Sequence, residues 1–114
     1  MKVLIVDDSE PVRRMIKTYL ADLIGETFEC GDGSEALDAY REHQPDLVLM
    51  DLKMVRMDGL EATRQIRQFF PQARIVIVSQ WEDANLRETA LLAGAEAYVC
   101  KSDLQPLQKI LAGS

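Results

Sequence analysis

Short apolar runs alternate with segments of helical periodicity along the chain, and this alternation constrains the fold more than any other feature of the sequence. The apolar runs, each of strand length, cover residues 2–6, 28–30, 47–50, 75–78 and 97–100. The periodic segments cover residues 11–23, 34–44, 59–70, 83–93 and 104–111. Strands that alternate with helices predict a parallel sheet with helices on both faces. We therefore predict an α/β fold, a doubly wound three-layer sandwich formed by one domain at residues 1–114.

Residues that favour helix ends indicate where the helices begin and stop. Proline is tolerated in a first helical turn, so Pro11 and Pro106 are expected to open the first and last helices. Ser34 is expected to cap the second helix, and Gly94 to close the fourth. The first helix is expected to bury one face, which comprises Val12, Met15, Ile16, Tyr19, Leu20 and Leu23.

Right-handed crossover connections leave few arrangements for five parallel strands. We expect the order 2-1-3-4-5, in which the chain reverses direction between the second and third strands. The reversal opens a crevice at the carboxyl ends of strands 1 and 3, where folds of this kind bind ligands. Cys30 and Cys100 then lie on opposite edges of the sheet, too far apart to form a disulfide.

The composition argues against several classes of function. A net charge of −6 argues against direct nucleic acid binding, which depends on clustered Lys and Arg. No apolar run approaches the roughly 20 residues that a membrane-spanning helix needs, so we expect no membrane association. The two cysteines show no metal-binding or disulfide spacing, which makes a reducing cytoplasm the expected location.

Acidic residues follow two of the strongest apolar runs. Asp7 and Asp8 end the first run, and Asp51 ends the third. Because both strand ends face the same crevice, we expect the three carboxylates to lie together and to repel one another unless a cation binds. Their hard oxygen atoms favour Mg²⁺. A single acid at such a position would more often be only a helix cap, but two strand ends that carry acids favour a site.

The remaining strands bring a hydroxyl group and an ammonium group to the same edge. Ser79 ends the fourth run and Lys101 follows the fifth. Together with the acids, these groups suit phosphoryl transfer, with Asp51 as the carboxylate nucleophile. Lys101 and the metal ion would balance charge on the transferring oxygens, and Ser79 would donate a hydrogen bond to the product.

These residues resemble the receiver domain of two-component response regulators, and the resemblance covers the whole chain. The matching pieces are VDD at residues 6–8, MDLKMVRMDG at 50–59, VIVS at 76–79 and GAEAYVCK at 94–101. Four pieces in the right order at four strand ends are specific, whereas an isolated acidic pair would not be. The family has a flavodoxin-like (βα)5 fold with the strand order 2-1-3-4-5, so our expectation of that order rests partly on the resemblance.

The resemblance implies that Asp51 accepts a phosphoryl group from a sensor histidine kinase or a phosphotransfer protein, as a signalling phosphoacceptor rather than an enzyme. Asp8, helped by Asp7, would hold Mg²⁺ together with Asp51 and the backbone carbonyl of Lys53. Such receivers promote their own phosphorylation and dephosphorylation.

The resemblance also implies a conformational switch. Ser79 would move toward the phosphoryl group and the ring of Tyr98 would turn inward. This movement would reshape the face formed by helix 4, strand 5 and helix 5, which would control an output domain or a partner. Homodimer formation through this face and a C-terminal DNA-binding output domain in a longer protein are the corresponding partner expectations.

The chain departs from the family pattern at several positions. Val55 replaces a usual proline, and Gln80 replaces a common small residue and is expected to crowd the pocket. Lys53 and Trp81 occupy the two variable positions that influence the lifetime of the phosphorylated state, so we expect altered dephosphorylation. Ser102 replaces the proline that often follows the lysine, so a trans peptide bond is expected there.

Three other interpretations compete with a phosphorylated receiver. A degenerate receiver could serve only as a protein-docking module, although the complete acid, serine and lysine set argues against this. A phosphatase of the haloacid-dehalogenase type needs a second acid two residues after the first, where this chain has Lys53. A flavin or nucleotide site would need a Gly- or Ser/Thr-rich loop after the first strand, and the chain has DDSEP at residues 7–11.

Overall fold

The computed structural model describes residues 1–113 and confirms the predicted α/β fold. Five parallel strands form one sheet in the order β2-β1-β3-β4-β5, as expected. The strands are β1 (Lys2–Val6), β2 (Glu26–Cys30), β3 (Leu47–Asp51), β4 (Ile75–Ser79) and β5 (Ala97–Cys100). The helices are α1 (Glu10–Tyr19), a 3-10 turn (Gly33–Glu35), α2 (Ala36–His43), α3 (Gly59–Phe69), α4 (Ala84–Ala93) and α5 (Gln105–Ala112).

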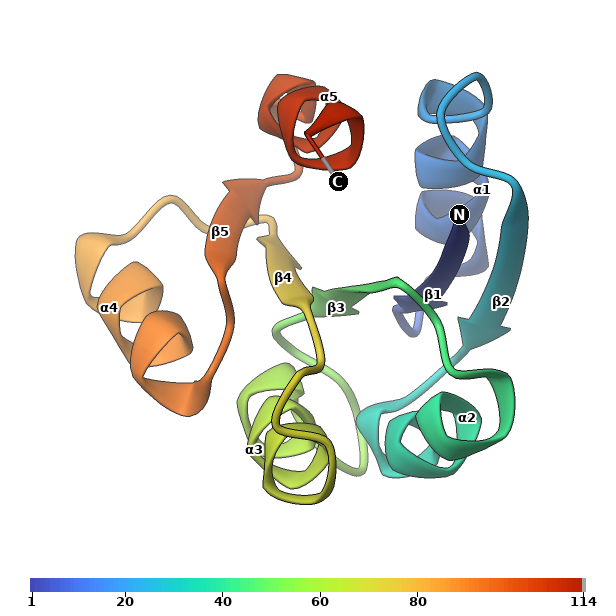
Figure 1. The fold of residues 1–114 in the computed structure, drawn as a ribbon. Coiled ribbons are helices and arrows are strands. Elements are labelled where there is room, and N and C mark those ends of the chain that lie inside the picture. The colour runs from blue at the N-terminus through green and yellow to red at the C-terminus, as the bar shows by residue number, and fades with distance from the viewer. Residues whose placement is uncertain (114) are drawn as a thin grey trace.

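Helices cover both faces of the sheet, and each face has its own core. Figure 1 shows α1 and α5 on one face of the sheet and α2 and α3 on the other, with α4 beside β5. One buried cluster joins the sheet to α2, α3 and α4, and a second joins it to α1 and α5. Every residue of the central strands β3 and β4 is buried, which explains why these strands appear as continuous apolar runs.

Several local predictions are confirmed. Pro11 and Pro106 lie in the first turns of α1 and α5, and Gly94 ends α4 with a left-handed φ of 116°. Cys30 and Cys100 lie on the edge strands β2 and β5 as free thiols. Within residues 1–113 no peptide bond is cis, so the bond after Lys101 is trans. No helix in the same range is long and apolar enough to span a bilayer.

The predicted buried face of α1 is too wide. Ile16 and Leu20 are fully buried, but Met15, Tyr19 and Leu23 are 43, 39 and 39% exposed. The helix also ends at Tyr19, before the predicted limit of residue 23. Only the central stripe of α1 contacts the sheet, so the residues at the sides of the apolar pattern remain in solvent.

Ser34 does not cap the second helix. Asp32 begins this region instead, because its carboxylate accepts a hydrogen bond of 2.9 Å from the backbone N–H of Ser34. A 3-10 turn then leads into α2, and Glu35, the residue before this helix, forms no side-chain capping hydrogen bond. Asp, like Ser, is a strong cap former, and a DGS sequence does not reveal which of the two will act.

Candidate functional site

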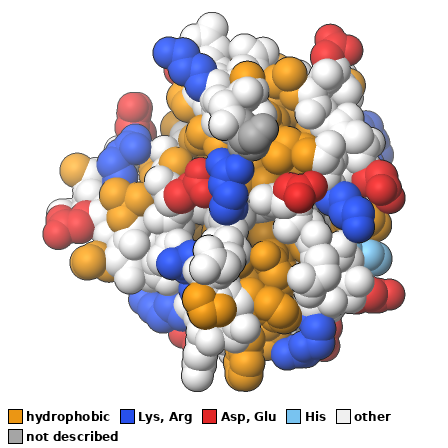
Figure 2. Space-filling view, in the orientation of Figure 1, with side chains coloured by type: hydrophobic (Ala, Val, Ile, Leu, Met, Phe, Trp, Pro, Cys, Tyr) orange, Lys and Arg blue, Asp and Glu red, His pale blue; other side chains and the backbone are white. Residues whose placement is uncertain are grey.

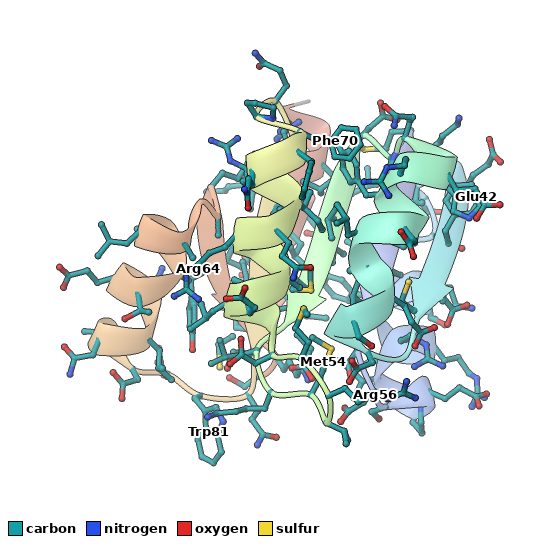
Figure 3. The ribbon with its side chains drawn as sticks, turned by 90° about the horizontal axis from the view of Figure 1, so that it is seen from below. Glu42, Met54, Arg56, Arg64, Phe70 and Trp81 are labelled. Atoms are coloured by element: carbon teal, nitrogen blue, oxygen red, sulfur yellow. The ribbon has the colours of Figure 1, made fainter. Side chains whose placement is uncertain are left out.

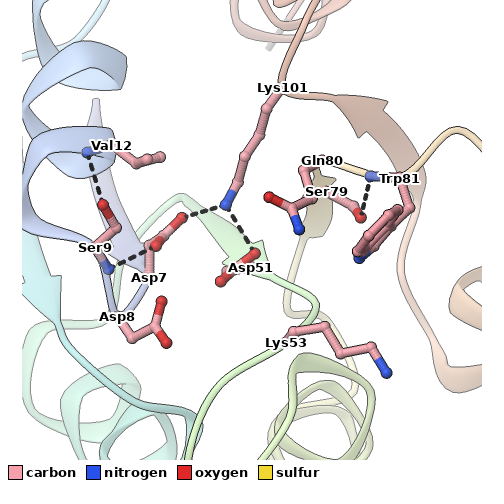
Figure 4. A pocket seen from close by; sticks show the side chains of 10 residues that line it. All are labelled: Asp7, Asp8, Ser9, Val12, Asp51, Lys53, Ser79, Gln80, Trp81 and Lys101. Atoms are coloured by element: carbon pink, nitrogen blue, oxygen red, sulfur yellow. Dashed lines mark hydrogen bonds and ion pairs between the residues drawn. The ribbon is translucent and has the colours of Figure 1, made fainter.

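A cleft of about 340 Å³ lies at the carboxyl end of the sheet, where the sequence predicted a ligand site. Val6 of β1 pairs with Met50 of β3, so the residues that follow them emerge side by side. Figure 3 shows Trp81, Met54 and Arg56 at this end of the molecule and Phe70 at the other. The cleft is lined by Asp7, Asp8, Ser9, Val12, Asp51, Lys53, Ser79, Gln80, Trp81 and Lys101 (Figure 4).

Three carboxylates meet in the cleft. Asp7, Asp8 and Asp51 each offer an oxygen atom, and these oxygens lie within 4.8 Å of one another. Asp7 and Asp51 are only 2 and 7% exposed, whereas Asp8 faces solvent. Buried anions at this separation require a compensating cation. The cluster therefore has the donor chemistry of a site that could bind a metal ion, and hard oxygen donors suit a hard divalent cation.

Lys101 supplies one positive charge to this cluster. Its Nζ atom lies 2.9 Å from Asp7 Oδ2 and 3.0 Å from Asp51 Oδ1, and its side chain is 16% exposed (Figure 4). Burial acts to lower the pKa of Lys101, but the hydrogen bonds to Asp7 and Asp51 and the charges of these acids outweigh burial and raise it. The ammonium group is therefore firmly protonated and bridges the two buried carboxylates.

Asp51 is the last residue of β3, the middle strand of the sheet. Its Oδ1 atom accepts hydrogen bonds from Lys101 and from the backbone N–H of Leu52, at 3.0 and 2.9 Å. Burial raises the pKa of Asp51 and the charge of Asp7 adds to this effect, while Lys101 opposes both. A partly desolvated carboxylate at the open end of a strand has the position that a nucleophile needs.

Ser79 and Trp81 form the other side of the cleft. Ser79 is 1% exposed, and its hydroxyl oxygen accepts a hydrogen bond of 3.0 Å from the backbone N–H of Trp81. Trp81 is 49% exposed at the rim, and Gln80 and Lys53 are also exposed lining residues. The structure thus brings all the predicted side chains of the acid, serine and lysine set to one cleft.

The sequence profile of the response regulator receiver domain matches residues 3–112 of this chain. The chain belongs to the response regulator receiver family. It is 37% identical to the chemotaxis protein CheY of Halobacterium salinarum over 108 residues, which cover 95% of this chain and 87% of that protein. It is therefore a CheY-like receiver domain with an acidic pocket, of the kind found in two-component signalling systems.

Two further relatives show the range of proteins that contain such a receiver. The transcriptional regulatory protein YhcZ of Bacillus subtilis is 41% identical over 108 residues, and the match covers 93% of this chain but only 50% of YhcZ. The CheX–CheY–BeF3–Mg²⁺ complex from Borrelia burgdorferi has 27% identity and a TM-score of 0.85, covering 99% of this chain and 88% of the other. Receivers of this kind thus occur alone and as parts of longer regulators.

Ser79 and Tyr98, the two predicted switch residues of the receiver, are both hydrogen-bonded to the backbone of Trp81. Trp81 donates its N–H to the Ser79 hydroxyl, and its carbonyl accepts a hydrogen bond of 2.6 Å from the hydroxyl of Tyr98. Arg87 on α4 stacks over the Tyr98 ring, with Cζ at 5.3 Å from the centroid, and donates to the Tyr98 carbonyl at 3.1 Å. The structure holds the ring in a buried position, 4% exposed, while movement between two positions stays a prediction.

Asp32 is a buried acid of the receiver that our sequence analysis did not identify. Its Oδ1 atom accepts a hydrogen bond of 2.9 Å from the backbone N–H of Arg56, which lies 24 residues away in the loop after β3. Burial, the largest single effect, acts to raise the pKa of Asp32. Hydrogen bonds from Arg56, Ser34 and Met57 together outweigh burial and lower this pKa to about 2. Asp32 therefore fixes the loop that begins at the predicted phosphoacceptor.

We expect the Asp32→Ala variant to lose about 2–4 kcal/mol of unfolding free energy at pH 7, because hydrogen bonds to a buried charged acceptor are lost. The pKa of Asp32 is lower in the folded chain than its ordinary value of 3.8, so its stabilisation is present above that value and disappears toward pH 2. Urea titrations from pH 7 to pH 2 should show the difference from wild type shrinking below about pH 4.

Asp38→Ala is the matched control, because Asp38 is 87% exposed on α2 and pairs with the exposed Arg41 on the same helix. It should change the unfolding free energy by less than about 0.5 kcal/mol. If Asp32→Ala were no more destabilising than Asp38→Ala, the role assigned to Asp32 would be wrong.

Proposed function

We propose that this receiver accepts a phosphoryl group on the carboxylate of Asp51 from the phosphohistidine of a sensor histidine kinase or phosphotransfer protein. An oxygen of Asp51 forms a bond to phosphorus while the bond from phosphorus to the imidazole nitrogen breaks, and that nitrogen keeps the electron pair. The observation that carries the proposal is the meeting of three acids with Lys101, whose Nζ lies 3.0 Å from Asp51 Oδ1. Lys101 balances charge on the transferring oxygens, and Ser79 donates to the product.

We also propose that the acid cluster binds Mg²⁺. Asp7, Asp8 and Asp51 would provide carboxylate oxygens, and Lys53 its backbone carbonyl. Mg²⁺ prefers one or two carboxylates, water and phosphate oxygens, which matches this donor set. When bound, the ion supplies positive charge next to the transferring group. The presence of Mg²⁺ in the Borrelia burgdorferi CheY complex supports this assignment.

Phosphorylation would act as a switch on the face formed by α4, β5 and α5. The new phosphate adds about two negative charges beside Ser79, and only one of two local packings satisfies them. The bonds that join Ser79, Trp81 and Tyr98 offer a path from the cleft to this face. Receivers are signalling proteins, and we propose that this one controls its partner through the α4–β5–α5 face.

The partner could be a second copy of this chain or an output domain. Residues 1–114 would form a single receiver domain, and a DNA-binding output domain in a longer protein is favoured by the similarity to half of YhcZ. Figure 2 shows acidic and basic side chains interspersed over one face of the receiver. The net charge of −6 disfavours DNA binding by the receiver itself, so we assign DNA binding to the output domain. We place the protein in the cytoplasm, where histidine kinases present their phosphohistidine.

Phosphorylation can be tested with a small phosphodonor. The wild-type chain, incubated with acetyl phosphate and MgCl₂, should gain about 80 Da in intact-protein mass spectrometry, the mass of one phosphoryl group. Asp51→Asn should show no adduct. An adduct that persists in Asp51→Asn, or its absence from a folded wild-type chain, would refute the proposed function.

Trp81 and Lys53 should control how long the phosphate survives. Both line the cleft, and Trp81 covers part of its rim. We expect the Lys53→Asn/Trp81→Glu variant to lose phosphate several times faster than wild type, because water then reaches Asp51 more easily. The measurement is a time course of the mass adduct after removal of the phosphodonor. Glu82→Gln, an exposed neighbour that does not line the cleft, is the control, and equal decay in all three proteins would contradict the assignment.

A further inference from the structure

Arg13 contacts the backbone that carries the acid cluster. It lies near the start of α1, its side chain is only 16% exposed, and its Nη1 atom donates a hydrogen bond of 2.5 Å to the carbonyl oxygen of Asp7. Its Nε atom donates to Glu29 Oε1 on β2 at 2.8 Å. Lys17 pairs with the other oxygen of Glu29 at 2.7 Å. Arg13 is thus held between the edge strand and the loop after β1.

The carbonyl that Arg13 contacts belongs to the peptide bond between Asp7 and Asp8. The two acids are held very differently. Asp7 donates its N–H to the Cys30 carbonyl, and its carboxylate accepts a hydrogen bond from the N–H of Ser9. The exposed Asp8 carboxylate has no hydrogen-bond partner within residues 1–113. The preceding peptide sets the direction of the Asp8 Cα–Cβ bond, and with it the region that the Asp8 carboxylate can reach beside Asp51.

We propose that Arg13 is a positioning residue for the divalent cation, and that Glu29 acts by holding Arg13. The inference rests on the cation site of the proposed function and adds to it residues that do not line the cleft. Arg13 fixes the peptide between two of the three acids, so the carboxylates stay within 4.8 Å of one another. Partners behind a metal ligand that orient it commonly change metal affinity by about 10- to 100-fold when they are removed.

If Arg13 acted only through its charge, its removal would change the Mg²⁺ affinity in the opposite direction. Arg13 is a cation close to the site, so its removal would strengthen Mg²⁺ binding if charge alone mattered. Positioning predicts weaker binding in spite of the lost positive charge. The sign of the change therefore separates the two explanations.

The test is a titration with MgCl₂ followed by the fluorescence of Trp81, the chain's single tryptophan, which lines the same cleft. Arg13→Ala should weaken Mg²⁺ binding by about tenfold relative to wild type. The Mg²⁺ affinity of Arg13→Lys should lie between those of wild type and Arg13→Ala, because one ammonium group cannot reproduce the two directed contacts of the guanidinium group. Arg14→Ala is the matched control, since Arg14 is an exposed neighbour that forms an ion pair with Glu10 on the helix surface.

A second pair of variants tests the role of Glu29. Glu29→Ala should weaken Mg²⁺ binding in the wild-type background and have little further effect in Arg13→Ala, because Glu29 acts through Arg13. Urea unfolding of each variant confirms that the chains are folded at the temperature of the titration. A merely structural role would lower stability and leave the Mg²⁺ affinity of the folded chain unchanged.

The outcomes distinguish failure of this inference from failure of the proposed function. Binding that is unchanged or tighter in Arg13→Ala overturns the positioning role and leaves the cation site intact. A wild-type chain that shows no saturable response to MgCl₂, either in Trp81 fluorescence or as heat in a calorimetric titration, has no cation site there, which overturns both proposals. Weaker binding in Arg13→Ala but not in Arg14→Ala supports the positioning role even in the absence of any phosphodonor.

Discussion

Replacement of Lys101 by methionine is expected to lower the rate of phosphorylation by acetyl phosphate by about 100-fold. Lys101 Nζ contacts both Asp7 and Asp51, and the methionine side chain keeps similar bulk while losing the charge. The oxygens of the phosphoryl group would then be balanced by Mg²⁺ alone instead of by Mg²⁺ and Lys101. The buried carboxylates of Asp7 and Asp51 would also repel each other more strongly. The rate of adduct formation at fixed MgCl₂ concentration measures the effect.

Lys109→Met is the control for this variant, because Lys109 is an exposed lysine on α5 and does not line the cleft. Acetyl phosphate should phosphorylate this variant at the wild-type rate. If Lys101→Met also did so while its unfolding free energy stayed the same, Lys101 would have no part in the transfer.

Gly59→Ala is expected to destabilise the receiver by about 2–3 kcal/mol and to slow phosphorylation as well. A Cβ atom at this position would collide with the carbonyl oxygen of Asp51 and lie 2.9 Å from Met50 Cγ. Gly59 also donates its N–H to the Leu52 carbonyl at 2.9 Å, so the first turn of α3 is packed directly against the end of β3. Relief of the collision must move either α3 or the backbone of the phosphoacceptor.

Gly31→Ala provides the matched comparison. Among residues 1–113, a Cβ atom there would meet only Arg13 Nη1, at 3.9 Å, which is an ordinary contact. Urea titrations and phosphorylation rates of the two variants should therefore differ clearly. Equal stability and equal rates would mean that the contact between Gly59 and Asp51 does not determine the geometry of the site.

The sequence allowed the sheet and its polar edge to be predicted because these depend on simple patterns. Strands buried on both faces are continuously apolar, so the polar residue that ends each run marks the carboxyl edge of the sheet. Asp51, Ser79 and Lys101 were identified in this way and meet in one cleft. The resemblance to receivers added roles that pattern alone does not give, such as the switch assigned to Tyr98.

The supporting contacts could not be predicted because they join residues that are distant in the sequence. Asp32 bonds to the backbone of Arg56, and Arg13 bonds to the backbone of Asp7 and to Glu29. Backbone partners leave no trace in the identity of the residue that provides them. Asp32 therefore resembled an ordinary turn residue and Arg13 an exposed helical charge until the fold placed them beside the loops that carry the site.

Chemical trapping of the modified residue tests the central claim most directly. Borohydride reduces an acyl phosphate to an alcohol, so an aspartate that has become phosphorylated loses about 14 Da relative to the unmodified residue. After incubation with acetyl phosphate and MgCl₂, peptide mass spectrometry should find this change at Asp51 and at no other aspartate. Reduction at Asp7 or Asp8 instead, or at no position in a folded chain that carries the phosphoryl adduct, would contradict our assignment.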